Sequence, residues 1–183
     1  MDVQNYIADM IEKARAAQKE FETYTQKEVD RVVRAVGKAI YDEGDPLAKM
    51  AIEETKIGSY EDKILKNKGK AMAVWNHLKN KKSIGIIRYL DDQGIVEVAH
   101  PKGVVGAIAP VTNPVMTLMH NAMIVLKGAN AIIIAPHPAG KNVGKKTCDI
   151  MRAALKDVGA PVDLIQGIEP DMVSSSGGGP SSP

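Results

Sequence analysis

Cysteine and aromatic residues are both scarce in this chain of 183 residues. The single cysteine, Cys148, excludes an internal disulfide and a zinc site built from cysteines, and it fits a reducing compartment. Aromatic residues make up only 4% of the sequence, so the core must be built from aliphatic side chains and the nine methionines. Hydrophobic residues at 44% and charged residues at 25% predict an ordinary globular protein of one domain, or one domain with an appendage.

The sequence also lacks a strong charge bias and a long apolar run. A formal net charge of +2 is too small to predict binding to nucleic acid or to an anionic membrane surface. The most apolar stretch, residues 122–136, is interrupted by Lys127, Gly128 and Asn130 and is too short to span a bilayer. The N-terminus has no basic segment followed by an apolar one, as a secretory signal would. We therefore expect a cytoplasmic protein with no nucleic-acid and no membrane partner.

The first part of the chain is predicted to be helical. Apolar side chains recur at helical spacing through residues 2–43, and a polar joint at residues 23–26 divides this run into two helices. Thr25 and Glu28 have the spacing of a capping box at the start of the second helix. Two more helices are expected, one over residues 46–55, after a stop at residues 44–46, and one over about residues 60–78.

The second part alternates strands with helices. Two β-rich runs around the turn residues 91–94 predict a hairpin over residues 84–99. Apolar runs and amphipathic stretches then follow in the order strand, helix, strand, helix, strand, which predicts a parallel sheet with right-handed crossovers. The strands are expected at residues 104–109, 131–135 and 162–165, and the helices at residues 114–126 and 142–158.

The fold class is therefore α/β. N-terminal helices and a β-hairpin precede a βαβαβ unit, which is one half of a doubly wound, Rossmann-like parallel sheet. The predicted parts are a helical part at residues 1–83, a hairpin at 84–100, a nucleotide-binding half at 101–170 and a tail or linker at 171–183. Ser and Gly dominate residues 174–183, which predicts a flexible segment.

Two proline-rich loops leave the first two parallel strands, at residues 109–114 and 135–140. Open parallel sheets bind ligands at the carboxyl ends of their strands, and Thr, Asn or His at a helix start can offer donors to an anion or a carbonyl oxygen. The alternative is that both loops are ordinary turns, with Asn113 as a helix N-cap before a proline. A G-x-G-x-x-G fingerprint is absent, since Gly103 and Gly106 have the wrong spacing and precede the strand instead of following it.

Residues 103–114 resemble the first nucleotide-binding strand and loop of the aldehyde dehydrogenase superfamily. Within them, Thr112-Asn113-Pro114 resembles the CoA-acylating branch of that family. Further similarity to that branch lies at residues 53–58, 61–67 and 135–138, and residues 126–134 resemble the family's entry to its second strand. The resemblance covers about residues 10–168. Within it, residues 94–99 together with residues 159–161 resemble acylating sulfoacetaldehyde dehydrogenases and short-chain relatives such as acetaldehyde dehydrogenases.

This resemblance implies NAD or NADP as cofactor and CoA as co-substrate. In the family, a cysteine forms a thioester with a short aldehyde substrate, and CoA then takes the acyl group. The residues implied to bind the cofactor are Ala109, Pro110, Val111 and Thr112 in the first loop, and Ala135, Pro136, His137 and Pro138 beside the adenosine ribose. Hydrolytic members have a Lys and a Glu where this chain has Ala135 and Pro138, so the resemblance leaves NAD and NADP open.

The resemblance also names two oxyanion candidates. Thr112 aligns with the oxyanion asparagine of hydrolytic members, whereas its neighbour Asn113 offers an amide N–H, which suits a carbonyl oxygen better. The family's nucleophile lies beyond residue 168, so this chain alone is expected to be inactive. Cys148 lies in the middle of a predicted helix among apolar neighbours such as Val143, Ile150 and Met151, so it is expected to be a small core residue.

The resemblance also implies that the full-length protein is a homo-oligomer, a dimer or tetramer, in which the hairpin takes part. The alternative is a non-catalytic nucleotide-binding or oligomerisation module from a split or vestigial family member.

The remaining polar features are interpreted structurally. No second ligand follows His77 or His120 at helical spacing, so no metal site is predicted. Seven lysines and no acidic residue lie between Lys63 and Lys82. They are expected to form a solvated helix face, with attraction of the CoA phosphates as the alternative.

Overall fold

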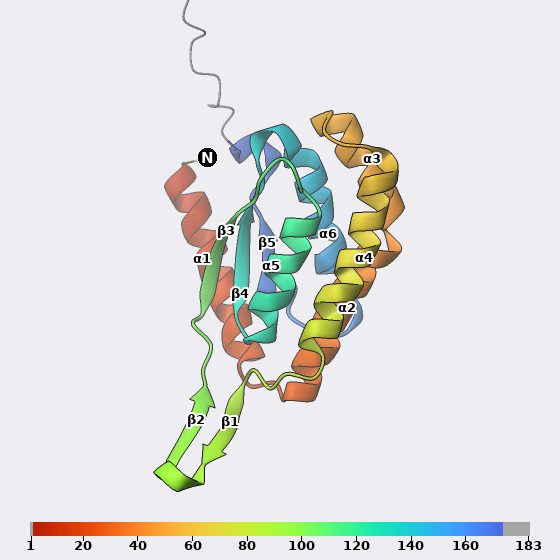
Figure 1. The fold of residues 1–183 in the computed structure, drawn as a ribbon. Coiled ribbons are helices and arrows are strands. Elements are labelled where there is room, and N and C mark those ends of the chain that lie inside the picture. Colours follow the sequence, from red (N-terminus) through yellow and green to blue (C-terminus); the bar gives the residue numbers. More distant parts are fainter. Residues whose placement is uncertain (1, 174–183) are drawn as a thin grey trace, which may run out of the picture.

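The computed structural model describes residues 2–173 and has the predicted α/β architecture (Figure 1). Four helices come first: α1 (Val3–Phe21), α2 (Gln26–Asp42), α3 (Gly44–Thr55) and α4 (Tyr60–Leu78). The hairpin strands are β1 (Gly85–Leu90) and β2 (Ile95–Ala99). The βαβαβ unit consists of β3 (Val104–Ile108), α5 (Met116–Lys127), β4 (Ala131–Ala135), α6 (Lys141–Asp157) and β5 (Ile165–Gly167). The flexibility predicted for residues 174–183 concerns a segment outside the described residues.

Local capping explains where the N-terminal helices begin. The capping box predicted at α2 is confirmed, because the Thr25 side chain accepts from the Glu28 N–H and the Glu28 carboxylate accepts from the Thr25 N–H. Helix α4 begins after Ser59, which accepts from the Asp62 N–H. Helix α3 begins at Gly44 and not at Pro46, because a proline within the first turn removes only an N–H that has no partner inside the helix.

The third parallel strand lies later than predicted. Val162–Leu164 form a 3₁₀ turn, and the strand β5 begins at Ile165, where pairing with β4 starts. Arg152 of α6 explains this shift, since its guanidinium donates to the carbonyl oxygens of Val162, at 3.0 Å, and Ile165. The Val162 carbonyl oxygen is therefore bound by a side chain within the 3₁₀ turn, and strand pairing begins only at Ile165.

The β3–β4–β5 sheet is parallel and lies between helical layers (Figure 1). Helix α1 covers one face, and α5 and α6 lie on the other. Helices α2, α3 and α4 form a further layer, in which α2 packs on both α5 and α6, α4 packs on α5, and α3 packs on α6. Met119, Met123 and Met151 are fully buried, which confirms a core of aliphatic side chains and methionine. No helix within residues 2–173 is both long enough and apolar enough to cross a membrane.

Two surfaces leave apolar side chains exposed. Strand β3 forms an edge of the sheet, and Ile108 at its carboxyl end is 88% exposed. The β1–β2 hairpin projects from the end of the molecule opposite the two proline-rich loops (Figure 1). It exposes Ile86, Tyr89, Ile95, Val96 and Val98, each between 44% and 62%.

Candidate functional site

The two proline-rich loops meet at the carboxyl ends of β3 and β4. The parallel register places Ile108 beside Ala135, and the Ala109 N–H donates to the Ala135 carbonyl oxygen at 2.9 Å. Both loops then turn back into helices on the same side of the sheet, α5 and α6 (Figure 1). The fold therefore brings together the two loops that the sequence marked as a candidate site. Helix α5 begins at Met116, two residues after its predicted start, so the first loop is longer than expected.

A buried lysine holds the first loop. Lys63 of α4 is 9% exposed, and its ammonium donates to the Thr112 carbonyl oxygen at 3.0 Å. Burial, together with repulsion from Lys66, lowers the pKa of Lys63. The Asn113 amide donates to the Thr112 hydroxyl at 3.4 Å, so both oxyanion candidates lie on the segment that Lys63 ties to α4.

This role of Lys63 corrects the interpretation of the lysine-rich stretch as a solvated face at one residue, since Lys66, Lys70, Lys79, Lys81 and Lys82 are exposed as expected. The structure shows that Lys63 lies four residues before Asn67 and eight before Ala71, which are both buried, although only Ala71 is apolar and could have indicated this face in advance. Helical spacing therefore places Lys63 on the buried face of α4. Asn67 on the same face donates to the Gly44 carbonyl oxygen at 2.9 Å, at the joint between α2 and α3.

The second loop packs closely onto α6. Pro136 is buried, and a Cβ atom on Gly144 of α6 would lie 2.5 Å from the Pro136 Cβ. His137 is exposed, and its Nδ1 accepts from the Ala139 N–H at 3.1 Å, which caps the 3₁₀ turn Pro138–Gly140. The His137 ring is therefore held against its own turn at the surface, with Pro138 half-buried beside it.

The start of α6 is already capped by a distant carboxylate. Glu54 of α3 accepts from the backbone N–H groups of Asn142, at 2.9 Å, and Val143, at 2.7 Å. It also accepts from the Asn142 side-chain amide at 3.0 Å. Helix α5 has no side-chain cap. Backbone N–H groups at a helix start bind phosphates, so the start of α6 is open to such an anion only if Glu54 moves away.

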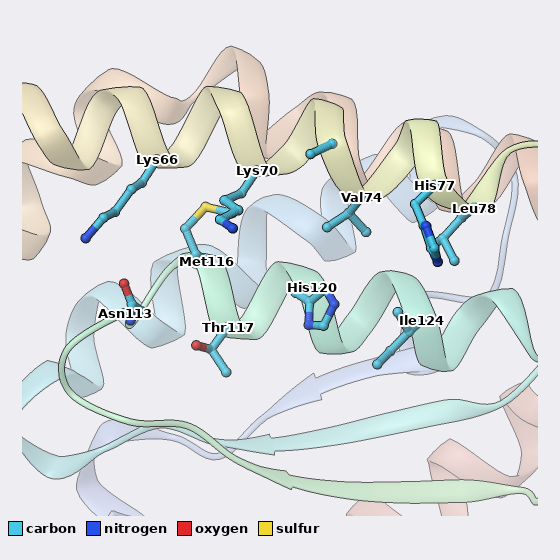
Figure 2. Close-up of a pocket in the computed structure, with 11 residues that line it drawn as sticks. Lys66, Lys70, Val74, His77, Leu78, Asn113, Met116, Thr117, His120 and Ile124 are labelled. Carbon is cyan, nitrogen blue, oxygen red and sulfur yellow. The ribbon is translucent and has the colours of Figure 1, made fainter.

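A groove of about 540 Å³ lies between α4 and α5 and reaches the first loop. Helix α4 contributes Lys66, Lys70 and Val74, and the first loop and α5 contribute Asn113, Met116 and His120. Figure 2 shows Lys66 and Asn113 at one end of the groove, with His77 and Ile124 at the other. The two histidines line this groove, a placement that the sequence did not indicate.

Cys148 is a core residue, as expected. It is 1% exposed on α6 and packs against β5, where a Cβ atom on Gly167 would lie 2.8 Å from the Cys148 Sγ. Burial raises the pKa of the Cys148 thiol to about 12, so very little thiolate forms near neutral pH. Cys148 therefore does not qualify as a nucleophile.

Comparison with known proteins identifies the family. Residues 3–175 match the model of the aldehyde dehydrogenase family. The chain belongs to this family. It is 51% identical, over 89% of its length, to the acetylating succinate-semialdehyde dehydrogenase of Clostridium kluyveri, and 46% identical, over 93%, to a sulfoacetaldehyde dehydrogenase of an Acholeplasma species. The chain spans 36% of the length of each of these relatives.

A solved structure agrees with the fold. The acetylating aldehyde dehydrogenase from Geobacillus thermoglucosidasius superimposes with a TM-score of 0.88 at 40% identity, covering 92% of this chain and 37% of the other. The resemblance to the acylating branch is thereby confirmed.

Proposed function

We propose that this chain forms the N-terminal, cofactor-binding part of an NAD(P)-dependent, CoA-acylating aldehyde dehydrogenase. The reaction converts a short aldehyde, CoA and NAD or NADP into an acyl-CoA and NADH or NADPH. The observation that carries this proposal is the meeting of the two loops at the carboxyl ends of β3 and β4, joined by the hydrogen bond from Ala109 to Ala135.

The proposed cofactor contacts follow from the two loops. Ala109, Pro110, Val111 and Thr112 would line the dinucleotide, and Ala135, Pro136, His137 and Pro138 would lie at its adenosine ribose. The loops fit such a ligand, because Pro110, Thr112 and His137 are exposed and proline stiffens both backbones. Neither loop carries a carboxylate, so nothing in them repels the 2′-phosphate of NADP.

Solved relatives support the cofactor and the co-substrate. An engineered glycolyl-CoA reductase, with a TM-score of 0.74 and 27% identity, holds NADP⁺. A propionaldehyde dehydrogenase from Rhodopseudomonas palustris, with a TM-score of 0.75 and 27% identity, holds CoA and an acylated cysteine. The names succinate-semialdehyde and sulfoacetaldehyde dehydrogenase support a short aldehyde as substrate.

In the proposed reaction, this chain binds and orients while the thiolate comes from elsewhere. A bound nicotinamide would supply the hydride acceptor. Asn113, or Thr112 beside it, would donate to the aldehyde oxygen as negative charge develops there. Cys148 is excluded as nucleophile by its burial, so these 183 residues by themselves are proposed to be inactive.

We also propose that the protein works in the cytoplasm as a homo-oligomer, a dimer or tetramer. The oligomer is supported by the β1–β2 hairpin, whose open edges and exposed apolar side chains suit pairing with a second copy. The same hairpin, together with the buried thiol, is what favours the second candidate, a non-catalytic nucleotide-binding or oligomerisation module.

The test is an assay of the complete protein that contains this chain, following nicotinamide absorbance with and without CoA. We expect reduction of the nicotinamide to depend on CoA and to yield acyl-CoA. Equal rates to the free acid without CoA would contradict the acylating assignment, and nucleotide binding without any turnover would favour the non-catalytic module. Replacing an oxyanion donor lowers kcat by a factor on the order of 10²–10³, so Asn113→Ala and Thr112→Ala, compared side by side, identify the donor.

A further inference from the structure

The groove between α4 and α5 has a cationic polar lining. Its charged side chains are Lys66 and Lys70, and its lining includes no acidic residue. Both lysines are exposed, and neither takes part in an ion pair among residues 2–173. Lysines on neighbouring helices behave differently, since Lys38 of α2 and Lys145 of α6 pair with acids one turn along. Among the residues that the structure describes, the groove therefore presents two cations without counter-ions.

The rest of the lining is suited to a short aliphatic chain. Val74 of α4 and Met116 of α5 give the groove an apolar wall, and Asn113 lies at one end beside Lys66 (Figure 2). Lys70 follows Lys66 by one helical turn, which places their Cβ atoms about 5–6 Å apart on the same side of α4. Asn113 and Lys66 thus lie together at one end of the groove, and Met116, Lys70 and then Val74 follow along it (Figure 2).

From this arrangement we infer that the groove selects a short aldehyde with an anionic group, a carboxylate or a sulfonate, and that Lys66 and Lys70 bind that group. The inference deepens the proposed function and rests on it. The carbonyl lies toward Asn113, the intervening carbons contact Met116, and the anion replaces water at the two ammonium groups. Lys63 adds positive charge at the same end, because it is bound to the carbonyl oxygen of Thr112, next to Asn113.

The phosphates of CoA are the other anions that two free lysines can bind. Two pairs of compounds distinguish the anionic group of the aldehyde from the phosphates of CoA. Succinic semialdehyde and butanal have the same number of carbons and differ in the carboxylate. CoA and dephospho-CoA differ in one phosphate. Lys66→Gln, Lys70→Gln and the double variant remove the charges and keep polar side chains. The matched control is Lys68→Gln on the same helix, because the Lys68 ammonium lies 5.9 Å from the centre of the Tyr41 ring, outside the groove lining.

Steady-state kinetics of the complete protein test the inference. We expect each single variant to raise KM for succinic semialdehyde about tenfold, the usual worth of one charge-assisted hydrogen bond, with kcat little changed. KM for butanal and for CoA should stay within about twofold, and Lys68→Gln should match the wild type. Succinate should inhibit competitively with the aldehyde, and its inhibition constant should rise in the same variants.

Four outcomes overturn the inference. If the lysine variants change KM for butanal and for succinic semialdehyde equally, the lysines do not bind the anionic group of the substrate. A rise in KM for CoA that disappears with dephospho-CoA assigns the lysines to the CoA phosphate instead. Absence of turnover with every aldehyde overturns the proposed function itself, and the substrate inference with it. If the protein turns over both aldehydes and the lysine variants leave both KM values unchanged, only the substrate inference is overturned.

Discussion

Removing the carboxylate of Glu54 is expected to destabilise the protein through a helix 88 residues away in the sequence. Glu54 accepts from two backbone N–H groups at the start of α6 and from the side-chain amide of Asn142. Loss of a cap costs about 1 kcal/mol, and loss of a negative charge at a helix start costs up to about 1 kcal/mol more. Glu54→Ala should therefore lower the free energy of unfolding by about 2 kcal/mol.

A chain of this size loses roughly 2–4 °C of Tm for each kcal/mol, so the expected shift for Glu54→Ala is about 4–8 °C. Glu54→Gln keeps an acceptor oxygen but loses the charge, and about half of the shift should remain. Glu53→Ala is the control, because Glu53 is the exposed neighbour and makes no side-chain hydrogen bond within residues 2–173. Urea and thermal unfolding, both followed by circular dichroism, provide the two measurements.

A second readout depends on the freed N–H groups themselves. In Glu54→Ala the start of α6 becomes available to an anion, so inorganic phosphate should stabilise this variant more than the wild type. If Glu54→Ala unfolds at the same urea concentration as Glu53→Ala, the carboxylate does not cap α6 in solution. Equal effects of phosphate on the variant and the wild type would refute the same reasoning independently.

Three further predictions concern the thiol and the second loop. Iodoacetamide at pH 8 should leave Cys148 unmodified until the protein unfolds, and alkylation at the rate of a free thiol would contradict its burial. Burial raises the Cys148 pKa from 9.0 to about 12, so the folded state favours the neutral thiol. The stability that the neutral thiol contributes is therefore present below pH 9 and is lost as the pH rises toward 12. Cys148→Ala should therefore lose less stability than the wild type between pH 9 and 12, as measured by urea unfolding. Pro138→Glu should lower the affinity for NADP relative to NAD by about tenfold, since a carboxylate repels a 2′-phosphate, and an unchanged ratio in a fluorescence titration would place Pro138 away from the ribose.

Local sequence signals explain why the predicted helices and strands were mostly correct. The capping box of Thr25 and Glu28 depends on residues three apart, and the β-rich runs around residues 91–94 needed only the turn between them. The shift of β5 was missed because Arg152, on another element, binds the carbonyl oxygen of Val162 within the 3₁₀ turn. The start of α3 was missed by two residues, because Pro46 is tolerated within a first helical turn.

The sequence by itself determined the order of helices and strands, the two proline-rich loops and the apolar surroundings of Cys148. All of these depend on residues close together in the chain, where periodicity and capping operate. The tertiary structure alone decided that Lys63 reaches the Thr112 carbonyl oxygen, that Glu54 caps α6, and that Lys66 and Lys70 face α5 across a groove. Each of these depends on how separate elements pack, because burial and hydrogen bonding between distant residues are set by the relative positions of whole helices and not by any local pattern.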